Sequence, residues 1–353
     1  MKPRDEGYGM PAEWARHQRT FVSWPVRESM CFPETYARVC SGTAEFIAAI
    51  AEFEPVTVLV NGEDEAYATS VLASRLAAGQ AGGDSVHFPI DWFVQPHSDS
   101  WLRDNGPTFV ADDKGGIAGI NWQFNAWGGK YAPWDLDNEV APAILKRYGV
   151  RCFDAPLVME GGSIHTDGEG TLLTTEECLL NPNRNPALNR EAIESLLWSY
   201  LGVERIIWLG NGLDGDETDG HVDNLACFAA PGKVILQVCQ DEADPNHLIG
   251  KEALSVFERA VDAKGRNIEV VKIPQPPMRM GVESRLTLSY LNFYFVNDGI
   301  ILPIFGGDAA SSDEEAVRIL SATFPERRIR TIDGMGIVTE GGNVHCATQQ
   351  MPA

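Results

Sequence analysis

The sequence predicts an α/β protein built from repeated units of strand, hairpin and helix in a cyclic array, in place of a simple Rossmann sheet. Three observations lead to this prediction. Turns rich in Gly, Asp and Asn join pairs of apolar runs four times, stretches with helical spacing separate these pairs, and one six-residue motif occurs twice. Repetition of this kind is typical of arrays of similar structural units.

The paired apolar runs are predicted to be β-hairpins, because short turns of Gly, Asp, Asn or Pro between apolar segments favour that structure. The turns read Asp-Asp-Lys-Gly-Gly, Asp-Gly-Glu-Gly, Pro-Gly-Lys and Asn-Asp-Gly in chain order. The four predicted hairpins occupy residues 107–122, 163–175, 225–238 and 290–305.

Helices are predicted between the hairpins, at residues 189–201 and 245–263. The first has apolar side chains at the spacing of one helix face. These are Ile193, Leu196, Leu197, Tyr200 and Leu201. Shorter apolar runs at 55–60 and 205–209 are predicted to be further strands of the repeated units.

The repeated motif reads Glu-Gly-Gly-Ser-Ile-His at residues 160–165 and Glu-Gly-Gly-Asn-Val-His at residues 340–345. Each copy is expected just before a strand or inside one. Glycines in such places let backbone segments approach one another closely. The two copies are therefore expected near a central axis of the array.

The size and composition are those of an ordinary globular protein, with 353 residues, 44% hydrophobic and 22% charged. No low-complexity linker divides the chain, so we expect one catalytic domain over residues 1–353. No run approaches the roughly 18 apolar residues of a membrane helix, and the first residues lack the apolar core of a signal peptide. We therefore expect a cytoplasmic protein with no membrane partner.

The formal net charge of −22 argues against a nucleic-acid partner, whose phosphates require a basic surface. It is compatible with a cationic substrate, and equally with plain solubility. The seven cysteines are scattered, odd in number and without a Cys-x-x-Cys pair. This arrangement is unlike a disulfide framework or a structural zinc site, so we expect most of them to be buried apolar residues.

Three short patterns that could indicate a cofactor or a metal are rejected. Residues 210–215 fit Gly-x-Gly-x-x-Gly, but an acidic loop follows where a dinucleotide-binding site needs a helix. The acidic run from Asp214 has Asp219 where a calcium loop needs glycine and Leu225 where it needs glutamate. No zinc-binding pair of the His-Glu-x-x-His type is present. The sequence therefore predicts neither cofactor nor metal.

A set of polar residues remains beside strands and glycine-rich turns. Asp104 precedes a predicted hairpin, and Glu160 opens the first copy of the repeated motif. His221 and Asp223 are two residues apart, which would place them on one face of a strand. Cys346 directly follows the second copy of the motif. Each has an ordinary structural explanation by itself, but together a thiol, an imidazole and several carboxylates suit covalent cysteine catalysis on a cation.

Along nearly its whole length the chain resembles the agmatine deiminases. This family belongs to the guanidino-modifying superfamily, is related to bacterial peptidyl-arginine deiminases, and has the five-bladed α/β-propeller (pentein) fold. The resemblance runs from Met-Pro-Ala-Glu-Trp at 10–14 to Cys-Ala-Thr-Gln-Gln-Met-Pro at 346–352. The matching segments are 100–107, 124–130, 160–170, 220–224 and 341–346.

The resemblance implies a role for each matching residue. It makes Cys346 the nucleophile and His221 the general acid and base. It makes Asp104 and Asp223 the carboxylates that grip the guanidinium, with Glu160 supporting the site. Trp101 is similar to a tryptophan that lines the substrate channel. The fold implies that a strand around residues 20–24 joins the last blade beside Cys346, so that the two terminal segments close that blade together.

The expected reaction converts agmatine and water into N-carbamoylputrescine and ammonia through a thiouronium on Cys346. The cationic substrate and a protonated His221 are both expected to lower the pKa of the thiol. Two carboxylates can hold the planar guanidinium by paired hydrogen bonds while the thiolate attacks from above. The partner is thus a small cationic guanidino compound, and the sequence is also compatible with a homo-oligomer.

Three other functions stay open at this point. Free or peptide-linked arginine could replace agmatine, an amine could replace water as in an amidinotransferase, or the chain could be an inactive binding protein of the same fold. Agmatine is preferred because a buried arginine carboxylate would need a cation, and few lie near the motifs: Arg103, Lys130 and Arg285. Arg103 is expected to point away from Asp104 along a strand. Residues 274–289 form a shorter segment than in plant-like members, which bears on how the substrate tail is enclosed.

Overall fold

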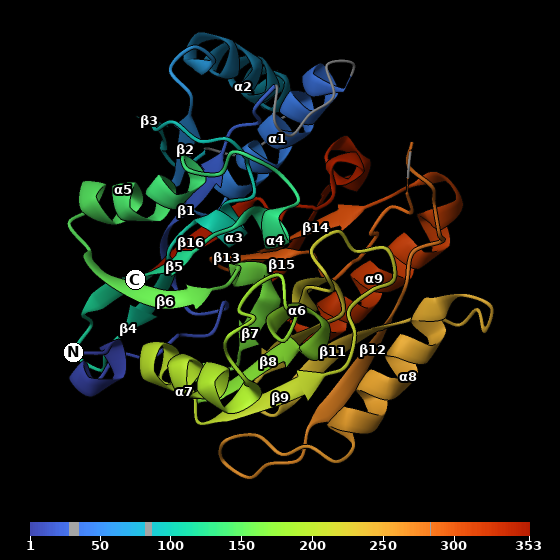
Figure 1. Cartoon of the computed structure of the whole chain (residues 1–353). Helices are drawn as coiled ribbons and strands as arrows, with labels where there is room; N and C mark the ends of the chain where they lie inside the picture. Colours follow the sequence, from blue (N-terminus) through green and yellow to red (C-terminus); the bar gives the residue numbers. More distant parts are fainter. Residues whose placement is uncertain (28–34, 82–86, 283) are drawn as a thin grey trace.

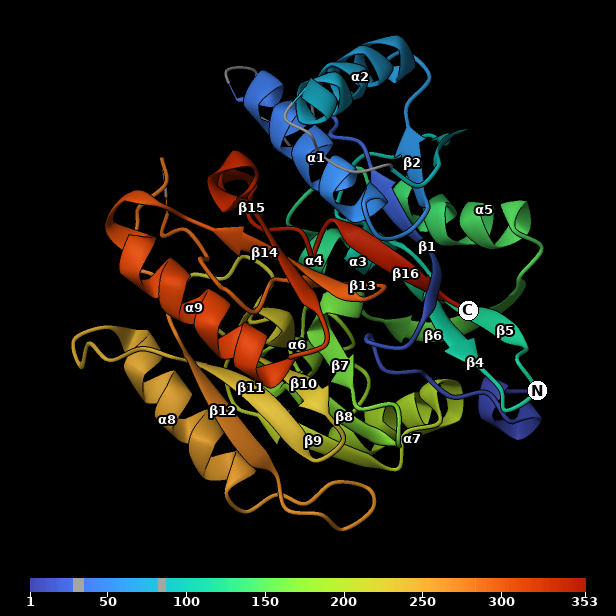
Figure 2. The same cartoon turned by 180° about the vertical axis from the view of Figure 1, so that it is seen from behind.

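The strands of the protein form five small sheets, and helices pack on the outside of them (Figures 1 and 2). The computed structural model describes residues 1–27, 35–81, 87–282 and 284–353. The first strands of neighbouring sheets contact one another, β16 with β4 and β7 with β10. This arrangement fits the predicted five-fold repeat and α/β class.

Four of the sheets share one plan. Two antiparallel strands form a hairpin, a helix follows, and a third strand returns parallel to the second. Their strands are β4 (Thr108–Ala111), β5 (Ile117–Gln123) and β6 (Arg151–Val158); β7 (Ile164–Thr166), β8 (Thr171–Thr175) and β9 (Arg205–Leu209); β10 (Ala226–Ala230), β11 (Lys233–Val238) and β12 (Glu269–Pro274); β13 (Tyr294–Val296), β14 (Gly299–Ile304) and β15 (Arg328–Asp333). The helices that precede the returning strands are α5 (Val140–Arg147), α7 (Arg190–Leu201), α8 (Pro245–Phe257) and α9 (Ala310–Thr323).

The remaining sheet joins the two terminal segments of the chain. Its strand order is β16-β1-β2-β3, with β1 (His17–Ser23) antiparallel to β16 (Thr348–Pro352) and parallel to β2 (Val56–Val60). The strand β3 (Ile90–Val94) completes it, and the helices α1 (Tyr36–Ala51) and α2 (Glu65–Ala81) pack against each other beside it. Val22 pairs with Thr348, so β1 lies next to the strand that begins two residues after Cys346.

The four predicted hairpins are confirmed, as are the strands at 55–60 and 205–209 and the helix at 189–201. Asn189 caps that helix by accepting from the backbone N–H of Ala192. The helix predicted over 245–263 is too long, because α8 ends at Phe257. A turn follows, in which the Asp262 carboxylate accepts from the backbone N–H of Lys264 and Arg266.

Apolar side chains fill the space between the helices and the sheets. In α7 the predicted stripe is buried at Ile193, Leu197, Tyr200 and Leu201, whereas Leu196 is partly exposed. Burying one such side chain stabilises the fold by about 1.5–3 kcal/mol. Among the described residues, every helix is too short or too polar to cross a membrane.

Three short helices lie in the loops that lead into or out of the sheets. They are α3 (Leu102–Asn105), α4 (Ala126–Gly129) and α6 (Glu176–Leu179). The helix α3 lies beside the last part of the chain, because the backbone N–H of Arg103 donates to the carbonyl of Cys346. Buried polar side chains gather at this contact. The predicted site residues lie in this region.

Candidate active site

Cys346 lies just before β16, and its side chain is buried with 6% of the residue exposed. The amide Nδ2 of Asn292 donates to the Sγ of Cys346 over 3.0 Å. The carboxylate Oδ2 of Asp223 lies 3.5 Å from the same sulfur. The side-chain oxygen of Asn292 also accepts from the backbone N–H of His345, so this asparagine fixes both the thiol and the backbone beside it.

The two carboxylates expected to hold a guanidinium are both buried and both fixed by hydrogen bonds. Asp104, in α3, accepts from the indole Nε1 of Trp127 over 2.9 Å and from the backbone N–H of Gly162 over 3.0 Å. Asp223 lies 2.9 Å from the Nδ1 of His345. Each carboxylate thus keeps one orientation.

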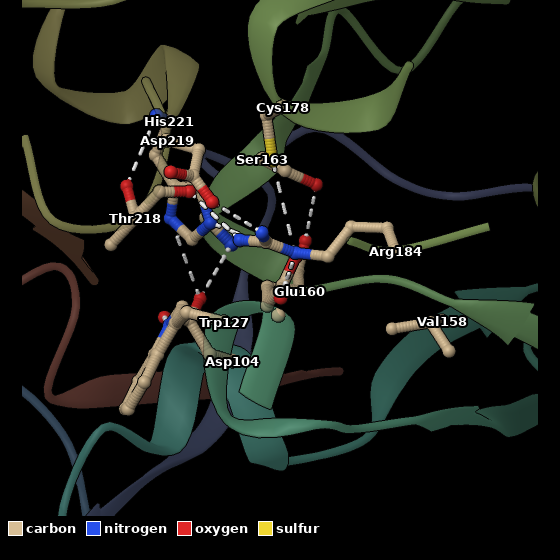
Figure 3. A network of polar contacts seen from close by, with 12 residues as sticks. Asp104, Trp127, Val158, Glu160, Ser163, Cys178, Arg184, Thr218, Asp219 and His221 are labelled. Atoms are coloured by element: carbon tan, nitrogen blue, oxygen red, sulfur yellow. Dashed lines mark hydrogen bonds and ion pairs between the residues drawn. The ribbon is translucent and has the colours of Figure 1, made fainter. Parts of the chain in front are cut away.

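His221 is completely buried between two carboxylates (Figure 3). Its Nδ1 lies 3.8 Å from the Oδ1 of Asp104, and its Nε2 lies 3.8 Å from the Oε2 of Glu160. These are charge contacts longer than hydrogen bonds, and neither ring nitrogen has a hydrogen-bond partner among the described residues. Glu160 is held from its other side by Arg184, whose Nε donates to Oε1 over 2.8 Å. The imidazole thus lies between two carboxylates, with no short hydrogen bond to either among the described residues.

The electrostatics of the site favour a protonated imidazole among ionised carboxylates. Burial lowers the pKa of His221, but Asp104, Cys178 and Glu160 outweigh it, so this pKa lies well above the usual value. Burial raises the pKa of Glu160, yet His221 and Arg184 bring it below its ordinary value. Burial raises the pKa of Asp104 to about 6, with Asp223 and Glu160 adding to it and His221 opposing.

Two glycines of the repeated motif make room for these side chains. A Cβ on Gly162 would lie 2.6 Å from the Nδ1 of His221, 2.9 Å from Asp223 and 3.0 Å from Asp104. A Cβ on Gly342 would lie 2.8 Å from the ring of Trp101 and 2.9 Å from the Cβ of Cys346. Close approach of backbone segments was predicted for these glycines, whereas at Gly162 and Gly342 the groups that approach are side chains of predicted site residues.

Comparison with known proteins identifies the family of the chain. The sequence profile described as Porphyromonas-type peptidyl-arginine deiminase matches residues 9–352. The chain belongs to this family. Agmatine deiminase of Stutzerimonas stutzeri is 47% identical, and that of Pseudomonas aeruginosa strain LESB58 is 44% identical, each alignment covering 99% of this chain and 97% of the relative. The structure of agmatine deiminase of Enterococcus faecalis superposes with a TM-score of 0.88 at 34% identity, over 99% of this chain and 97% of that one.

In this member of the deiminase family a cavity of about 60 Å³ leads to the thiol. Trp101, which is 7% exposed, forms part of its wall as predicted. The cavity is lined by Asp99, Trp101, Asp104, Trp127, Tyr131, Glu217, Thr218, Glu340, Gly341, Gly342 and Cys346. Four of these residues are acidic, and none of the described lining residues is Lys, Arg or His.

The three cations considered for a substrate carboxylate are engaged elsewhere. Arg103 is buried against Glu13, with Nη1 3.3 Å from Oε1. Lys130 pairs with Asp219 over 2.7 Å and also donates to the carbonyl of Glu217. Arg285 binds the carboxylate of Asp244 through both terminal nitrogens, over 2.8 and 2.7 Å. The described part of the 274–289 segment, which contains Arg285, does not line the cavity.

Two local predictions for this deiminase family member were wrong. His221 and Asp223 were expected on one face of a strand, but residues Val222–Asn224 form a 3-10 turn. The turn aims His221 at Glu160 and Asp223 at His345, and both still converge on Gly162. Arg103 does point away from the cavity, but because α3 is helical and not because strand side chains alternate.

The cationic substrate and a protonated His221 were expected to lower the pKa of Cys346, and in the protein alone this pKa is shifted in the opposite direction. Burial raises the pKa of this thiol well above its usual value, and Asp223 and Asp104 raise it further. The hydrogen bond from Asn292 acts in the opposite direction and does not reverse the shift. Burial and the two carboxylates therefore disfavour the thiolate in the protein alone.

Sequence reasoning gave no role to Asn292, Trp127 and Arg184, although each contacts a predicted site residue. Trp127 lies in the matching segment 124–130, and Asn292 lies in the predicted hairpin 290–305. In each case the sequence signal was a side chain able to form hydrogen bonds within a glycine-rich or an apolar stretch. Trp127 also has a left-handed backbone with φ of 55°, which is unusual for an aromatic residue. Such a conformation indicates that the surrounding structure dictates where the indole points.

The structure also brings together three side chains that could ligate a metal ion. The ligand atoms of Glu160, Cys178 and His221 all lie within 4.8 Å of one another and are buried. The sequence gave no sign of this set, since the three residues are far apart along the chain. The same atoms also form contacts within the protein, because the Sγ of Cys178 lies 4.0 Å from Oε2 of Glu160.

Proposed function

We propose that this protein hydrolyses agmatine to N-carbamoylputrescine and ammonia, with Cys346 as nucleophile. The observation that carries the proposal is the cavity over the thiol, which has four acidic residues, two tryptophans and no cationic residue among those described. A substrate with a guanidinium at one end and an ammonium at the other matches such a lining. The agmatine deiminases that resemble the chain over nearly its full length support the same substrate.

Asp104 and Asp223 are proposed to grip the guanidinium. An oxygen of each carboxylate lies within 3.0 Å of the Cβ position on Gly162, so the two side chains are neighbours, and the Cys346 sulfur lies 3.5 Å from Asp223. Two carboxylates that accept from the guanidinium nitrogens fix its plane, as in paired arginine–carboxylate contacts. The central carbon is then presented to the sulfur, which reduces the entropy lost on reaching the transition state.

Substrate binding is proposed to activate the thiol. Asp104 and Asp223 raise the pKa of Cys346 while their charges are uncompensated. A guanidinium between them offsets those charges, so the thiol loses its proton to water and the thiolate forms next to its target. The proposal thus makes Cys346 reactive only when the cation is bound.

His221 is proposed to move protons in both halves of the reaction. The thiolate adds to the guanidinium carbon, and the protonated imidazole gives its proton to one nitrogen, which leaves as ammonia. A thiouronium on Cys346 remains. The neutral imidazole then takes a proton from water, which adds to the same carbon. The C–S bond breaks, the hydroxyl proton of the adduct passes to the departing sulfur, and the ureido product and the neutral thiol are released. Asp104, and Glu160 held by Arg184, raise the pKa of the imidazole and favour its charged form.

The name of the matching family makes arginine in a peptide the principal rival substrate. A carboxylate or peptide backbone beside the acidic lining would leave polar groups unpaired, at a cost of a few kcal/mol. Ammonia release should be measured with agmatine, free arginine and a blocked arginine peptide. Agmatine should give the highest kcat/KM. A higher value for arginine or the peptide would reject the proposed substrate, and no release from any of the three would favour an inactive binding protein.

We further propose that the protein acts in the cytoplasm. The described cysteines Cys40, Cys152, Cys178, Cys227, Cys239 and Cys346 are free thiols, which suits a reducing compartment. Cys31, the seventh cysteine of the sequence, lies outside the described residues.

The sequence is also compatible with a homo-oligomer. Light scattering on the purified protein tests this, and the mass of a monomer would reject it.

A further inference from the structure

A chain of buried side chains leads from the candidate active site to the N-terminal segment. The Oδ2 of Asp223, which lies 3.5 Å from the Cys346 sulfur, is 2.9 Å from the Nδ1 of His345. The other ring nitrogen of His345 lies 3.0 Å from each carboxylate oxygen of Glu13. All three residues of this relay, Glu13, His345 and Asp223, are at most 2% exposed.

The proton positions in the relay follow from its partners. Burial and Arg103 lower the pKa of His345, but the carboxylates on either side outweigh them and raise it. Each ring nitrogen lies within hydrogen-bond distance of a carboxylate, which accepts, so both nitrogens donate, one to Asp223 and one to Glu13. An imidazole that donates from both nitrogens to two carboxylates is fixed in one orientation. Because one oxygen of Asp223 accepts from His345, the other oxygen remains for a substrate.

Glu13 is itself fixed by groups from two other parts of the fold. The guanidinium of Arg103 lies 3.3 Å from its Oε1. The Nε2 of His165 lies 3.5 Å from its Oε2. The Nδ1 of His165 accepts from the backbone N–H of Phe228, so the proton of a neutral His165 is on the nitrogen that faces Glu13. The final histidines of both motif copies thus converge on one glutamate.

We propose that Glu13 and His345 are positioning residues that hold Asp223 in the orientation needed to bind the guanidinium. The inference rests on the proposed function, because it concerns how the same cation is gripped. Glu13 itself does not line the cavity and lies on the far side of His345 from Asp223. It acts through the imidazole, in the way that second partners orient the ligands of a metal site.

A purely structural role for Glu13 is the alternative, and the protein contains a matched control for it. Glu54 is also buried and pairs with a buried histidine, since its Oε1 lies 2.9 Å from the Nδ1 of His17. The Nε2 of His17 lies 2.8 Å from the backbone carbonyl of Glu13, so the pair occupies the same region. It has no link to Asp223 by a side-chain hydrogen bond among the described residues. Glu54→Gln therefore disturbs the same region without removing a side-chain hydrogen bond of the relay.

The test compares Glu13→Gln with Glu54→Gln in the full-length protein. Both variants should lower the melting temperature, because each loses one charge of a buried pair. Only Glu13→Gln should raise KM for agmatine, by roughly tenfold to a hundredfold, the range found when a partner that orients a ligand is removed. Its kcat should fall less, since the thiol and His221 stay in place. Equal kinetic effects of the two variants would overturn the proposal.

A binding measurement separates this proposal from the proposed function. In the Cys346→Ser background, calorimetry with methylguanidine measures how the carboxylates hold the cation without any tail. Glu13→Gln should weaken this binding by about tenfold or more, and it should have no further effect when Asp223→Asn is also present. Unchanged or additive binding would reject the relay. If the wild-type protein released no ammonia from agmatine while the binding results held, only the substrate assignment would fail.

Discussion

The side-chain amide of Asn292 donates to the sulfur of Cys346 over 3.0 Å, while its oxygen accepts from the backbone N–H of His345. This residue lowers the pKa of a thiol that burial and two carboxylates raise. Asn292→Ala should therefore raise the pKa of Cys346 further and reduce kcat by about tenfold, the effect of losing one hydrogen bond to a charged group. Asn292→Asp should be worse, because it adds a third carboxylate beside the thiolate.

The pH dependence of Cys346 alkylation by iodoacetamide, followed by mass spectrometry of its peptide, measures this pKa. Asn138→Ala is a suitable control, since Asn138 bonds the backbone of Phe124 and does not contact the thiol. An alkylation profile that is the same in Asn292→Ala and in the wild-type protein would contradict the assigned role.

Replacing Cys346 by serine should abolish turnover and leave the fold intact, because a hydroxyl is far less ionised than a thiol at neutral pH. Cys40→Ser and Cys239→Ser should retain activity, as neither residue lines the cavity. Ammonia release and circular dichroism on all three variants check this. Substantial turnover by Cys346→Ser would rule out a covalent thiouronium.

The pH profile of kcat/KM should have an acidic limb near pH 6, the value to which burial raises the pKa of Asp104. A raised pKa means that Asp104 becomes protonated, and loses its grip on a cation, as the pH falls through that value. Trp127→Phe removes the indole hydrogen bond that lowers this pKa, so the limb should move to higher pH. Trp122→Phe loses a similar bond, to Thr108, away from the cavity, and should leave the limb in place.

Activity should survive exhaustive chelation. Glu160, Cys178 and His221 could together ligate a metal, but Arg184 already bonds Glu160, and His221 is protonated at neutral pH by virtue of its raised pKa. A protonated imidazole does not coordinate a metal. Dialysis against a chelator, with the residual metal measured, should leave kcat unchanged. Loss of activity that zinc or manganese restores would place a metal at these three residues.

Deleting residues 1–24 should destroy solubility, because β1 lies between β16 and β2 and its loss exposes two strand edges. The deletion also removes Glu13. Deleting only residues 1–6, which carry the short 3-10 helix Pro3–Glu6, should leave a soluble protein. The soluble fraction after expression compares the two truncations, and a soluble, active form lacking 1–24 would contradict the role of β1.

The repeated architecture could be predicted from the sequence because hairpins leave a strong local signal. Apolar runs on both sides of a short turn predicted β4–β5, β7–β8, β10–β11 and β13–β14. The four-residue helix α3 and the 3-10 turn after His221 could not be predicted in this way, because elements this short span no full period of apolar residues. Contacts with distant residues determine these elements. In α3, for example, the backbone N–H of Arg103 donates to the carbonyl of Cys346.

The candidate site followed the same rule. Cys346, His221, Asp104, Asp223 and Glu160 could be named because their types and motifs point to one chemistry, and the structure gathers them around Gly162 and Gly342. The residues that hydrogen-bond to these side chains could not be predicted. Nothing in the residues around Asn292 indicates that its amide meets a sulfur, and Glu13 gives no sign of bonding His345 from the opposite end of the sequence.

The pairing of β1 with β16 makes the assembly of the site a late event in folding. Contacts between residues so distant in the sequence close a very large loop and form slowly, whereas the hairpins of the other four sheets are local. During refolding, secondary structure should therefore return before ammonia release does. Until these two strands pair, Cys346 is not held beside Asn292 and Asp223 as it is in the folded protein.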